Sequence, residues 1–261
     1  MPEIEANGIL HHYEVAGQGP PILFIHGLGS SAGDWEYQVA HFSRRYQVVT
    51  YDVRGHGNSA RPRGPYSVPL FAADAAALIK ALQIEPAHIV GISMGGMIAF
   101  QLAISAPGLV RSLAIVNSAP ALVIKTLAEK RQLWQRLLIV RLLGMRKMGE
   151  VLGGRLLPKA EHAELRVLFA QRWAKNDPRA YLDAMRALVN WSVTDQLSAI
   201  RCPALVITSD HDYTPVEAKQ VYTALMPNAR LVVIEDARHA VTVERPAEFN
   251  QALGYFLAGL S

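Results

Sequence analysis

The sequence predicts an α/β fold, in which helices flank both faces of a mostly parallel sheet. Three observations support this prediction. Short, almost continuous runs of Val, Ile and Leu recur along the chain, and most are followed by turn residues and then by a stretch with helical spacing. The alternation is broken once, by a long segment with helical periodicity alone. Strands that are apolar at nearly every position are typical of parallel sheets buried on both faces.

The expected elements follow in chain order. Residues 8–15 alternate loosely and suggest an antiparallel edge strand. Helix N-caps favour Ser, and Pro is tolerated in the first turn, so Ser67 and Pro69 mark the start of the second helix. The strand-like runs are 22–25, 48–51, 88–92, 112–116, 204–208 and 231–234. The helical stretches are 35–45, 67–83, 94–106, 215–226 and 246–260.

One segment interrupts this pattern. From about residue 119 to 195 only helical periodicity is present, broken by glycines at 144, 149, 153 and 154 and then by Pro158. We therefore predict a helical domain at 119–195, inserted between two strands of a core domain formed by 1–118 and 196–261. Apolar side chains recur along one side of its first helix: Val123, Leu127, Trp134, Leu138, Leu142 and Met145.

The composition is that of a folded protein. With 261 residues, 51% of them hydrophobic and 18% charged, the chain can bury a large core, which excludes disorder. Cys202 is the only cysteine and follows no disulfide pattern, so it is expected to be a buried, inert thiol. No signal-peptide pattern and no run of about 18 apolar residues is visible, which favours a cytoplasmic protein without a membrane span.

The net charge of +4 is unevenly distributed. Residues 117–195 contain 14 Lys and Arg but only 7 Asp and Glu, so the basic excess lies in the inserted segment. No basic run interleaved with aromatic residues accompanies it, and nucleic acid is therefore not an expected partner. The simplest interpretation is a set of solvated helix faces that carry Arg131, Arg136, Arg141 and Lys147.

A glycine-rich turn after the first parallel strand offers an alternative function. Residues 27–33 are similar to the loop of a dinucleotide-binding fold, and Asp52 ends the next strand, where such folds keep a ribose-binding acid. His26 precedes the glycines, however, and Trp35 and Glu36 follow them. A more specific motif further along the chain argues against hydride transfer.

That motif is Gly91-Ile92-Ser93-Met94-Gly95-Gly96, between a strand and a helix. A serine at such a sharp turn adopts strained backbone angles, and the residues two before and two after it must be small. The turn places the hydroxyl above the carboxyl edge of the sheet, at the start of a helix. Ser93 is therefore predicted to be a nucleophile.

A serine nucleophile needs a base, and the base needs an orienting acid. Of the nine histidines, His239 follows the last strand at the sheet edge where Ser93 is expected, whereas His56 is expected to pack a tight turn. The acid should follow the preceding strand, in the segment Ser209–Pro215. Asp212 is preferred because it lies just before Pro215, and Asp210 remains the alternative.

A developing oxyanion needs hydrogen-bond donors. The backbone N–H of Met94, at the start of the helix, is one candidate, and that of Leu28, in the glycine-rich loop, is the second.

With these residues in place, the chain resembles the α/β-hydrolase superfamily. The matching motifs are His26–Gly29, the D-x-R-G-x-G-x-S run of Asp52–Ser59, Gly91–Gly95, Ser209–Pro215 and His239, in the order nucleophile, acid, histidine. The resemblance implies an eight-stranded sheet with a helical lid inserted after the sixth strand. It also implies catalysis by Ser93, Asp212 and His239, with Leu28 and Met94 as oxyanion donors. Ser209 and Arg238 stand where the family often has Gly.

The resemblance narrows the reaction without fixing it. Superfamily members that open epoxides or remove halides use Asp as the nucleophile, and here the residue is Ser93. The leading expectation is hydrolysis of a carboxylic ester or related acyl bond through an acyl-enzyme. Perhydrolysis or halogenation, C–C bond or thioester hydrolysis on the same triad, and non-catalytic ligand sensing remain alternatives. No metal or organic cofactor is expected, because the protein supplies the nucleophile, the base and the oxyanion donors.

The resemblance also suggests what the inserted helices bind. As a lid they would line a mostly apolar pocket for a small to medium substrate, with Trp134, Leu138, Leu142 and Met145 as candidate contacts. The basic excess admits an anionic carrier, coenzyme A or a carrier protein, at the outer lid. A monomer or a homodimer is expected.

Overall fold

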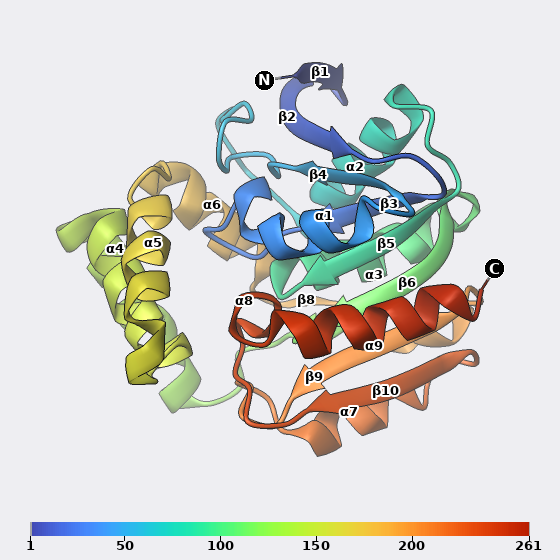
Figure 1. Ribbon diagram of the computed structural model, residues 1–261. Helices are drawn as coiled ribbons and strands as arrows, with labels where there is room; N and C mark the ends of the chain where they lie inside the picture. Colours follow the sequence, from blue (N-terminus) through green and yellow to red (C-terminus); the bar gives the residue numbers. More distant parts are fainter. Residues whose placement is uncertain (1, 261) are drawn as a thin grey trace.

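An eight-stranded sheet runs through the molecule, with helices on both of its faces (Figure 1). The computed structural model describes residues 2–260. The strand order is β1-β2-β4-β3-β5-β6-β9-β10, and all pairs from β4 to β10 are parallel. The strands are β1 (Glu3–Ala6), β2 (Ile9–Ala16), β3 (Pro21–Ile25), β4 (Gln47–Tyr51), β5 (Ala87–Ile92), β6 (Val110–Val116), β9 (Ala204–Ser209) and β10 (Ala229–Ile234). The predicted mostly parallel sheet is confirmed.

The sequence predicted that residues 8–15 form the edge of the sheet, but the structure has one further strand outside them. β2 pairs antiparallel with β4, as its alternation suggested, but β1 pairs with its other side and forms the edge. Asn7 and Gly8 both have positive φ angles, 50° and 72°, and form the tight turn that joins the two strands. Asn-Gly is the strongest short hairpin signal, so this turn was readable from the sequence.

Each face of the sheet packs against its own helices. In β3, Ile22 and Phe24 belong to the core beneath α1 (Glu36–Phe42) and α9 (Pro246–Ala258). Leu23 and Ile25 belong to the core beneath α2 (Val68–Ala81) and α3 (Met94–Ser105), and all four side chains are fully buried. Because neighbouring residues of a strand point to opposite faces, a strand buried on both faces must be apolar throughout.

The helix signals in the sequence correspond to real contacts. The hydroxyl of Ser67 accepts the N–H of Leu70 at 3.2 Å, and Pro69 lies in the first turn of α2, as expected. Two further helices complete the core, α7 (Val216–Thr223) and the short α8 (Val241–Glu244). No helix within residues 2–260 is both long and apolar enough to cross a membrane.

The helical insertion stands between β6 and β9, on the left of Figure 1. It consists of α4 (Leu127–Leu156), α5 (Ala163–Trp173) and α6 (Pro178–Leu188). Two short antiparallel strands, β7 (Ala121–Leu122) and β8 (Trp191–Ser192), pair its two ends.

Only one of the expected glycine interruptions breaks a helix. α4 is two helical segments that meet at Gly144, whose φ is 78° and ψ 179°. Gly149, Gly153 and Gly154 lie within the second segment. A Cβ on Gly149 would stand 2.7 Å from the Cβ of Trp173, so this glycine allows α4 and α5 to pack closely.

Candidate active site

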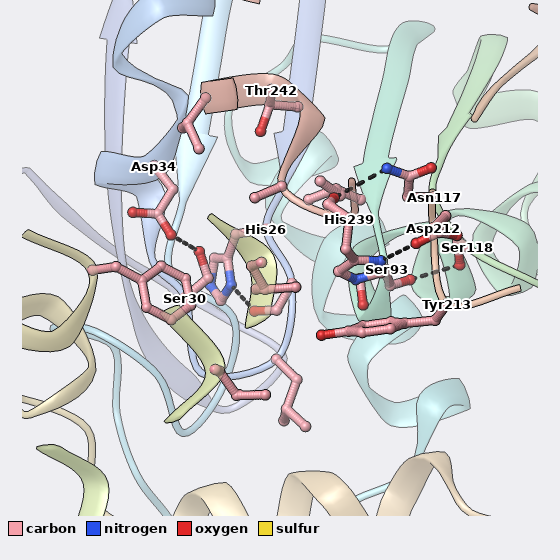
Figure 2. Close-up of a pocket in the computed structure, with 18 of the residues that line it drawn as sticks. His26, Ser30, Asp34, Ser93, Asn117, Ser118, Asp212, Tyr213, His239 and Thr242 are labelled. Atoms are coloured by element: carbon pink, nitrogen blue, oxygen red, sulfur yellow. Dashed lines mark hydrogen bonds and ion pairs between the residues drawn. The ribbon is translucent and has the colours of Figure 1, made fainter. Parts of the chain in front are cut away.

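The candidate catalytic residues follow strands of the parallel sheet. Ser93 directly follows β5, while Asp212 and His239 lie in the loops after β9 and β10. Because parallel strands end at the same edge of a sheet, these loops meet, and all three residues line one cavity (Figure 2).

Ser93 occupies the strained turn that the sequence predicted. Its φ is 56° and its ψ −118°, angles that few residues other than glycine adopt. A Cβ on Gly91 would stand 2.2 Å from the carbonyl oxygen of Gly95, and one on Gly95 would stand 2.0 Å from that of Ile25. The two glycines are therefore required for the turn, which holds Ser93 at the N-terminus of α3.

His239 is oriented by a carboxylate, and the carboxylate is that of Asp212. The Nδ1 of His239 lies 2.6 Å from Oδ1 of Asp212. Asp210 has a different environment, because its oxygens accept the backbone N–H groups of Asp236 at 2.9 Å and Ala237 at 3.1 Å. Asp210 thus shapes the loop that carries His239, while Asp212 contacts the imidazole itself.

A buried lysine that the sequence analysis missed contacts the second oxygen of Asp212. Lys219 of α7 bonds to Oδ2 of Asp212 and donates to the carbonyl of Thr214 at 3.0 Å. Its side chain is only 1% exposed and that of Asp212 only 2%. The sequence offered one signal for this buried lysine. Helical spacing places Lys219 on the same face of α7 as Tyr222 and Thr223, which are both buried.

These contacts decide the ionisation of Asp212. Burial by itself would raise the pKa of the carboxyl group, but the hydrogen bond and charge of His239, together with the Lys219 ammonium, lower the pKa to about 2. Asp212 is therefore a carboxylate at neutral pH, and a carboxylate fixes the tautomer of a histidine whose Nδ1 it contacts.

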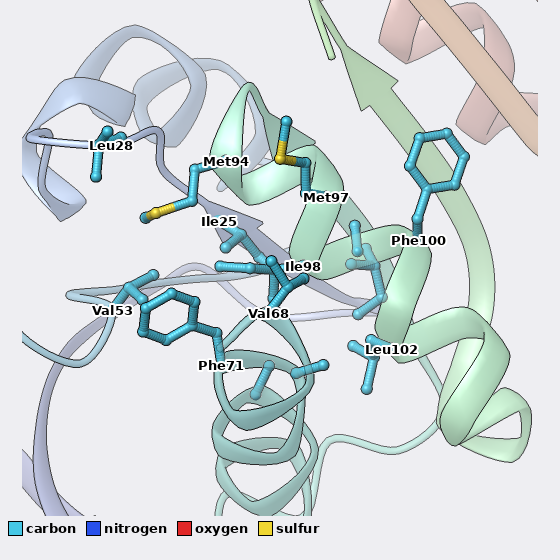
Figure 3. Packing of buried hydrophobic residues seen from close by; sticks show 14 of the residues in the cluster. Ile25, Leu28, Val53, Val68, Phe71, Met94, Met97, Ile98, Phe100 and Leu102 are labelled. Atoms are coloured by element: carbon cyan, nitrogen blue, oxygen red, sulfur yellow. The ribbon is translucent and has the colours of Figure 1, made fainter. Parts of the chain in front are cut away.

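The two residues predicted to supply oxyanion donors lie in the loop after β3 and at the start of α3. Met94 occupies the first position of α3, where N–H groups have no partner within the helix, and its side chain is buried in the core (Figure 3). Leu28 lines the cavity from the glycine-rich loop.

That loop is held by the insertion. Gly29 has a φ of 78°, a Cβ added to it would lie 2.6 Å from the Trp173 ring, and the amide of Asn176 donates to its carbonyl at 2.8 Å.

The cavity has a volume of about 300 Å³ and lies between the core and the insertion. The ring of Tyr213 lies beside that of His239, with centroids 4.4 Å apart. The inserted helices contribute a large share of the apolar lining. The inserted residues that line the cavity are Ala119, Ala121, Leu122, Arg136, Leu152, Leu156, Leu157, Leu165, Leu168, Phe169, Arg172, Trp173, Met185 and Leu188.

The four insertion residues expected to contact substrate do not line this cavity. Trp134, Leu138 and Leu142 face solvent, with exposed fractions of 70%, 54% and 71%, and Met145 is buried away from it. The prediction failed because the first segment of α4 carries two apolar stripes, and the inward one contains Leu133, Leu137 and Val140. Periodicity cannot tell which stripe faces inward. The expectation that Arg136 is solvated was wrong for the same reason.

The residues that suggested a dinucleotide site serve the fold instead. Asp52 is buried, and its carboxylate accepts the N–H groups of Ala32 at 2.8 Å and Asn58 at 2.7 Å, so it ties two loops together. His56 is buried in the second of these loops, as expected. Within residues 2–260, no three His, Cys, Asp or Glu side chains gather as potential metal ligands.

Known proteins share this fold. The family model described as "Alpha/beta hydrolase family" matches residues 22–252. A 3-oxoadipate enol-lactonase of Acinetobacter baylyi is 31% identical, over 96% of this chain and 94% of its own. The solved enol-lactonase of Burkholderia xenovorans is 27% identical with a TM-score of 0.90, covering 98% of this chain and all of that one. A malate-bound esterase of Thermogutta terrifontis is 25% identical with a TM-score of 0.91, covering 100% and 99%. The chain belongs to the alpha/beta hydrolase family, and it is a hydrolase.

Proposed function

We propose that the protein hydrolyses carboxylic esters or lactones through an acyl-enzyme on Ser93. The observation that carries the proposal is the placement of Ser93, in a positive-φ turn, on the same cavity as an imidazole whose Nδ1 contacts a buried carboxylate. The enol-lactonases and the esterase among the similar proteins support this reaction class.

The residues divide the chemistry between them. Ser93 Oγ attacks the carbonyl carbon while Nε2 of His239 takes its proton, and Asp212 stabilises the imidazolium that forms. The N–H groups of Leu28 and Met94 stabilise the oxyanion; each such donor contributes about 3 kcal/mol in the transition state. Collapse of the intermediate expels the alcohol, which takes the proton from His239. Water then attacks the acyl-enzyme, with His239 again as the base, and releases the acid.

The insertion then acts as a lid that binds the acyl chain. Leu156, Leu165 and Phe169 present apolar side chains to the cavity, and every methylene group buried there stabilises the complex by up to about 0.8 kcal/mol. A cavity of about 300 Å³ suits acyl groups of small to medium size.

The first test uses p-nitrophenyl acetate and butyrate. We expect turnover by the wild type, loss of at least 10³-fold in kcat for Ser93→Ala, and a mass increase equal to the acyl group on a trapped intermediate. Ser105→Ala, which removes a surface hydroxyl that bonds to Gln101 within the same helix, is the matched control and should keep full activity. If Ser93→Ala retains a tenth of the wild-type kcat, Ser93 is not the nucleophile.

A further inference from the structure

An arginine without an acidic partner lines the catalytic cavity. Arg136, from the first segment of α4, is half-buried and shares the cavity with Ser93 and His239. Its Nε donates to the hydroxyl of Tyr181 at 2.5 Å, and its guanidinium carbon lies 5.6 Å from the centre of the same ring. Within residues 2–260, no Asp or Glu oxygen lies within 4.0 Å of its nitrogens, and its two terminal NH₂ groups make no hydrogen bond.

The other charged groups of the cavity are already paired. Arg172 bonds to Asp34 at 2.7 Å and to Glu36 at 3.3 Å. Asp212 is held by His239 and Lys219. Among the described residues that line the cavity, Arg136 is therefore the cation that no carboxylate pairs.

The surroundings of Arg136 also fix its direction. Tyr181 is a fully buried residue of α6, so the bond from Nε to its hydroxyl restricts the rotation of the guanidinium. With Nε engaged, the donors that remain are those of the two terminal nitrogens. A planar pair of N–H donors matches the two oxygens of a carboxylate, and such bidentate bonds are stronger than neutral ones.

A partly buried cation without a counter-charge is costly, and a ligand that supplies the charge recovers that cost. We propose that Arg136 binds a carboxylate of the substrate, so that the natural substrates are carboxylate-bearing esters or lactones, such as half-esters of dicarboxylic acids. This inference rests on the proposed function and adds the substrate class.

Two esters that differ only at the far end of the acyl chain test it. Monomethyl adipate ends in a carboxylate, and methyl hexanoate ends in a methyl group at the same position. We expect the wild type to have the higher kcat/KM for monomethyl adipate. In Arg136→Met the ratio of the two kcat/KM values should fall by about 100-fold, because only one ester loses an ionic partner. Arg136→Lys should fall between, because a point charge replaces a planar pair of donors.

Arg141→Met is the matched control, because Arg141 is an exposed arginine on the same helix segment. It should leave both kcat/KM values unchanged. An equal loss for both esters in Arg136→Met would make Arg136 a structural residue and overturn the inference, while turnover by the wild type would leave the proposed function intact. A wild type with the higher kcat/KM for methyl hexanoate would likewise overturn the inference and leave the proposed function intact.

A binding measurement separates the inference from the reaction. Calorimetry should show adipate binding to Ser93→Ala, and at least 30-fold weaker binding to Ser93→Ala/Arg136→Met. Equal binding by the two variants would overturn the inference. If the wild type hydrolyses neither ester, the proposed function fails, and adipate binding alone then decides the role of Arg136.

Discussion

At the scale of single residues, Asp212 is shared between an imidazole and an ammonium group. One oxygen contacts the imidazole of His239, and the other bonds to the buried Lys219. In a Ser-His-Asp site the carboxylate stabilises the imidazolium that forms during the reaction. A lysine on the same carboxylate offsets part of that stabilisation, so we expect Lys219 to influence catalysis through Asp212.

Removing this charge should change the pH dependence of catalysis. In Lys219→Met the imidazolium faces an uncompensated carboxylate, so we expect the acid limb of the kcat/KM profile to move up by about one pH unit. Stability should fall by about 3–5 kcal/mol, because a buried carboxylate loses a partner.

Lys219→Gln is the second variant, because it keeps a hydrogen-bond donor without the charge. It should move the acid limb in the same direction. Lys147→Met removes an exposed lysine paired with Glu150 at 3.1 Å and should move nothing. If the melting temperature of Lys219→Gln falls while the acid limb stays in place, Lys219 serves only the fold.

Substitution of the two aspartates in the loop after β9 should reduce activity to different extents. We expect Asp212→Asn to reduce kcat by about 10⁴-fold, because the imidazole loses its tautomer and its counter-charge. Asp210→Asn should cost far less, because it weakens hydrogen bonds to two backbone amides of the His239 loop. Steady-state kinetics of both variants decide the matter, and equal losses would contradict the assignment to Asp212.

At the scale of elements, the end of α5 supports the loop that carries Leu28. The amide of Asn176 donates to the carbonyl of Gly29, and the Trp173 ring packs on the same glycine. An oxyanion donor is effective only when its position is fixed beforehand. We therefore expect the insertion to contribute to catalysis through the loop as well as through the cavity lining.

Asn176→Ala tests this support. We expect kcat for p-nitrophenyl butyrate to fall about 10-fold, since a donor that shifts slightly loses part of its transition-state stabilisation. Asn228→Ala is matched to it, because Asn228 also donates to a backbone carbonyl, that of Arg201 at 2.7 Å, and it directly precedes β10, at the edge of the sheet opposite to the cavity. Comparable kcat values for the two variants would show that the loop does not depend on Asn176.

Exposed and buried leucines of α4 should respond differently to substitution. Leu138 and Leu142 face solvent, so their replacement by Gln should change stability by less than about 0.5 kcal/mol and leave kcat/KM unchanged. Leu156 is 6% exposed and lines the cavity, so Leu156→Ala should cost about 2–5 kcal/mol and weaken the preference for longer acyl chains. Urea unfolding and a series of p-nitrophenyl esters provide both readouts.

At the scale of the whole molecule, buried histidines make the fold sensitive to acid. Burial, with the neighbouring His26, lowers the pKa of His56 to about 3, against an unfolded value of about 6.5. A histidine that is neutral when folded stabilises the protein above the unfolded pKa, and that stability is lost as the pH falls from about 6.5 towards 3. His56 by itself should remove about 1.4 kcal/mol per pH unit in this window.

His56→Asn separates this effect from packing. Nδ1 of His56 lies 3.1 Å from the carbonyl of Arg54, and an asparagine amide can keep a donor there without titrating. We expect the free energy of unfolding, measured in urea between pH 7 and pH 4.5, to fall less steeply for the variant than for the wild type. If the free energy of unfolding falls equally steeply with pH in both proteins, groups other than His56 dominate the loss of stability in acid.

The sequence by itself determined the sheet, its covering helices and the positions of Ser93 and His239. These features depend on local patterns: strands apolar throughout, a strand–turn–helix with required glycines, and loops that follow parallel strands. Because parallel strands end at the same edge of a sheet, the topology then brings these loops together there.

Only the tertiary structure decided which aspartate meets His239, which stripe of α4 packs against the core, and that Lys219 contacts Asp212 and Arg136 lines the cavity. Asp210 and Asp212 are two positions apart in the sequence and both contact the loop after β10, but only Asp212 reaches the imidazole of His239. Helical spacing fixes which residues share a face and leaves the rotation of the helix about its axis undetermined. That rotation is set by packing against segments far away in the chain, as when Tyr181 of α6 holds Arg136 of α4.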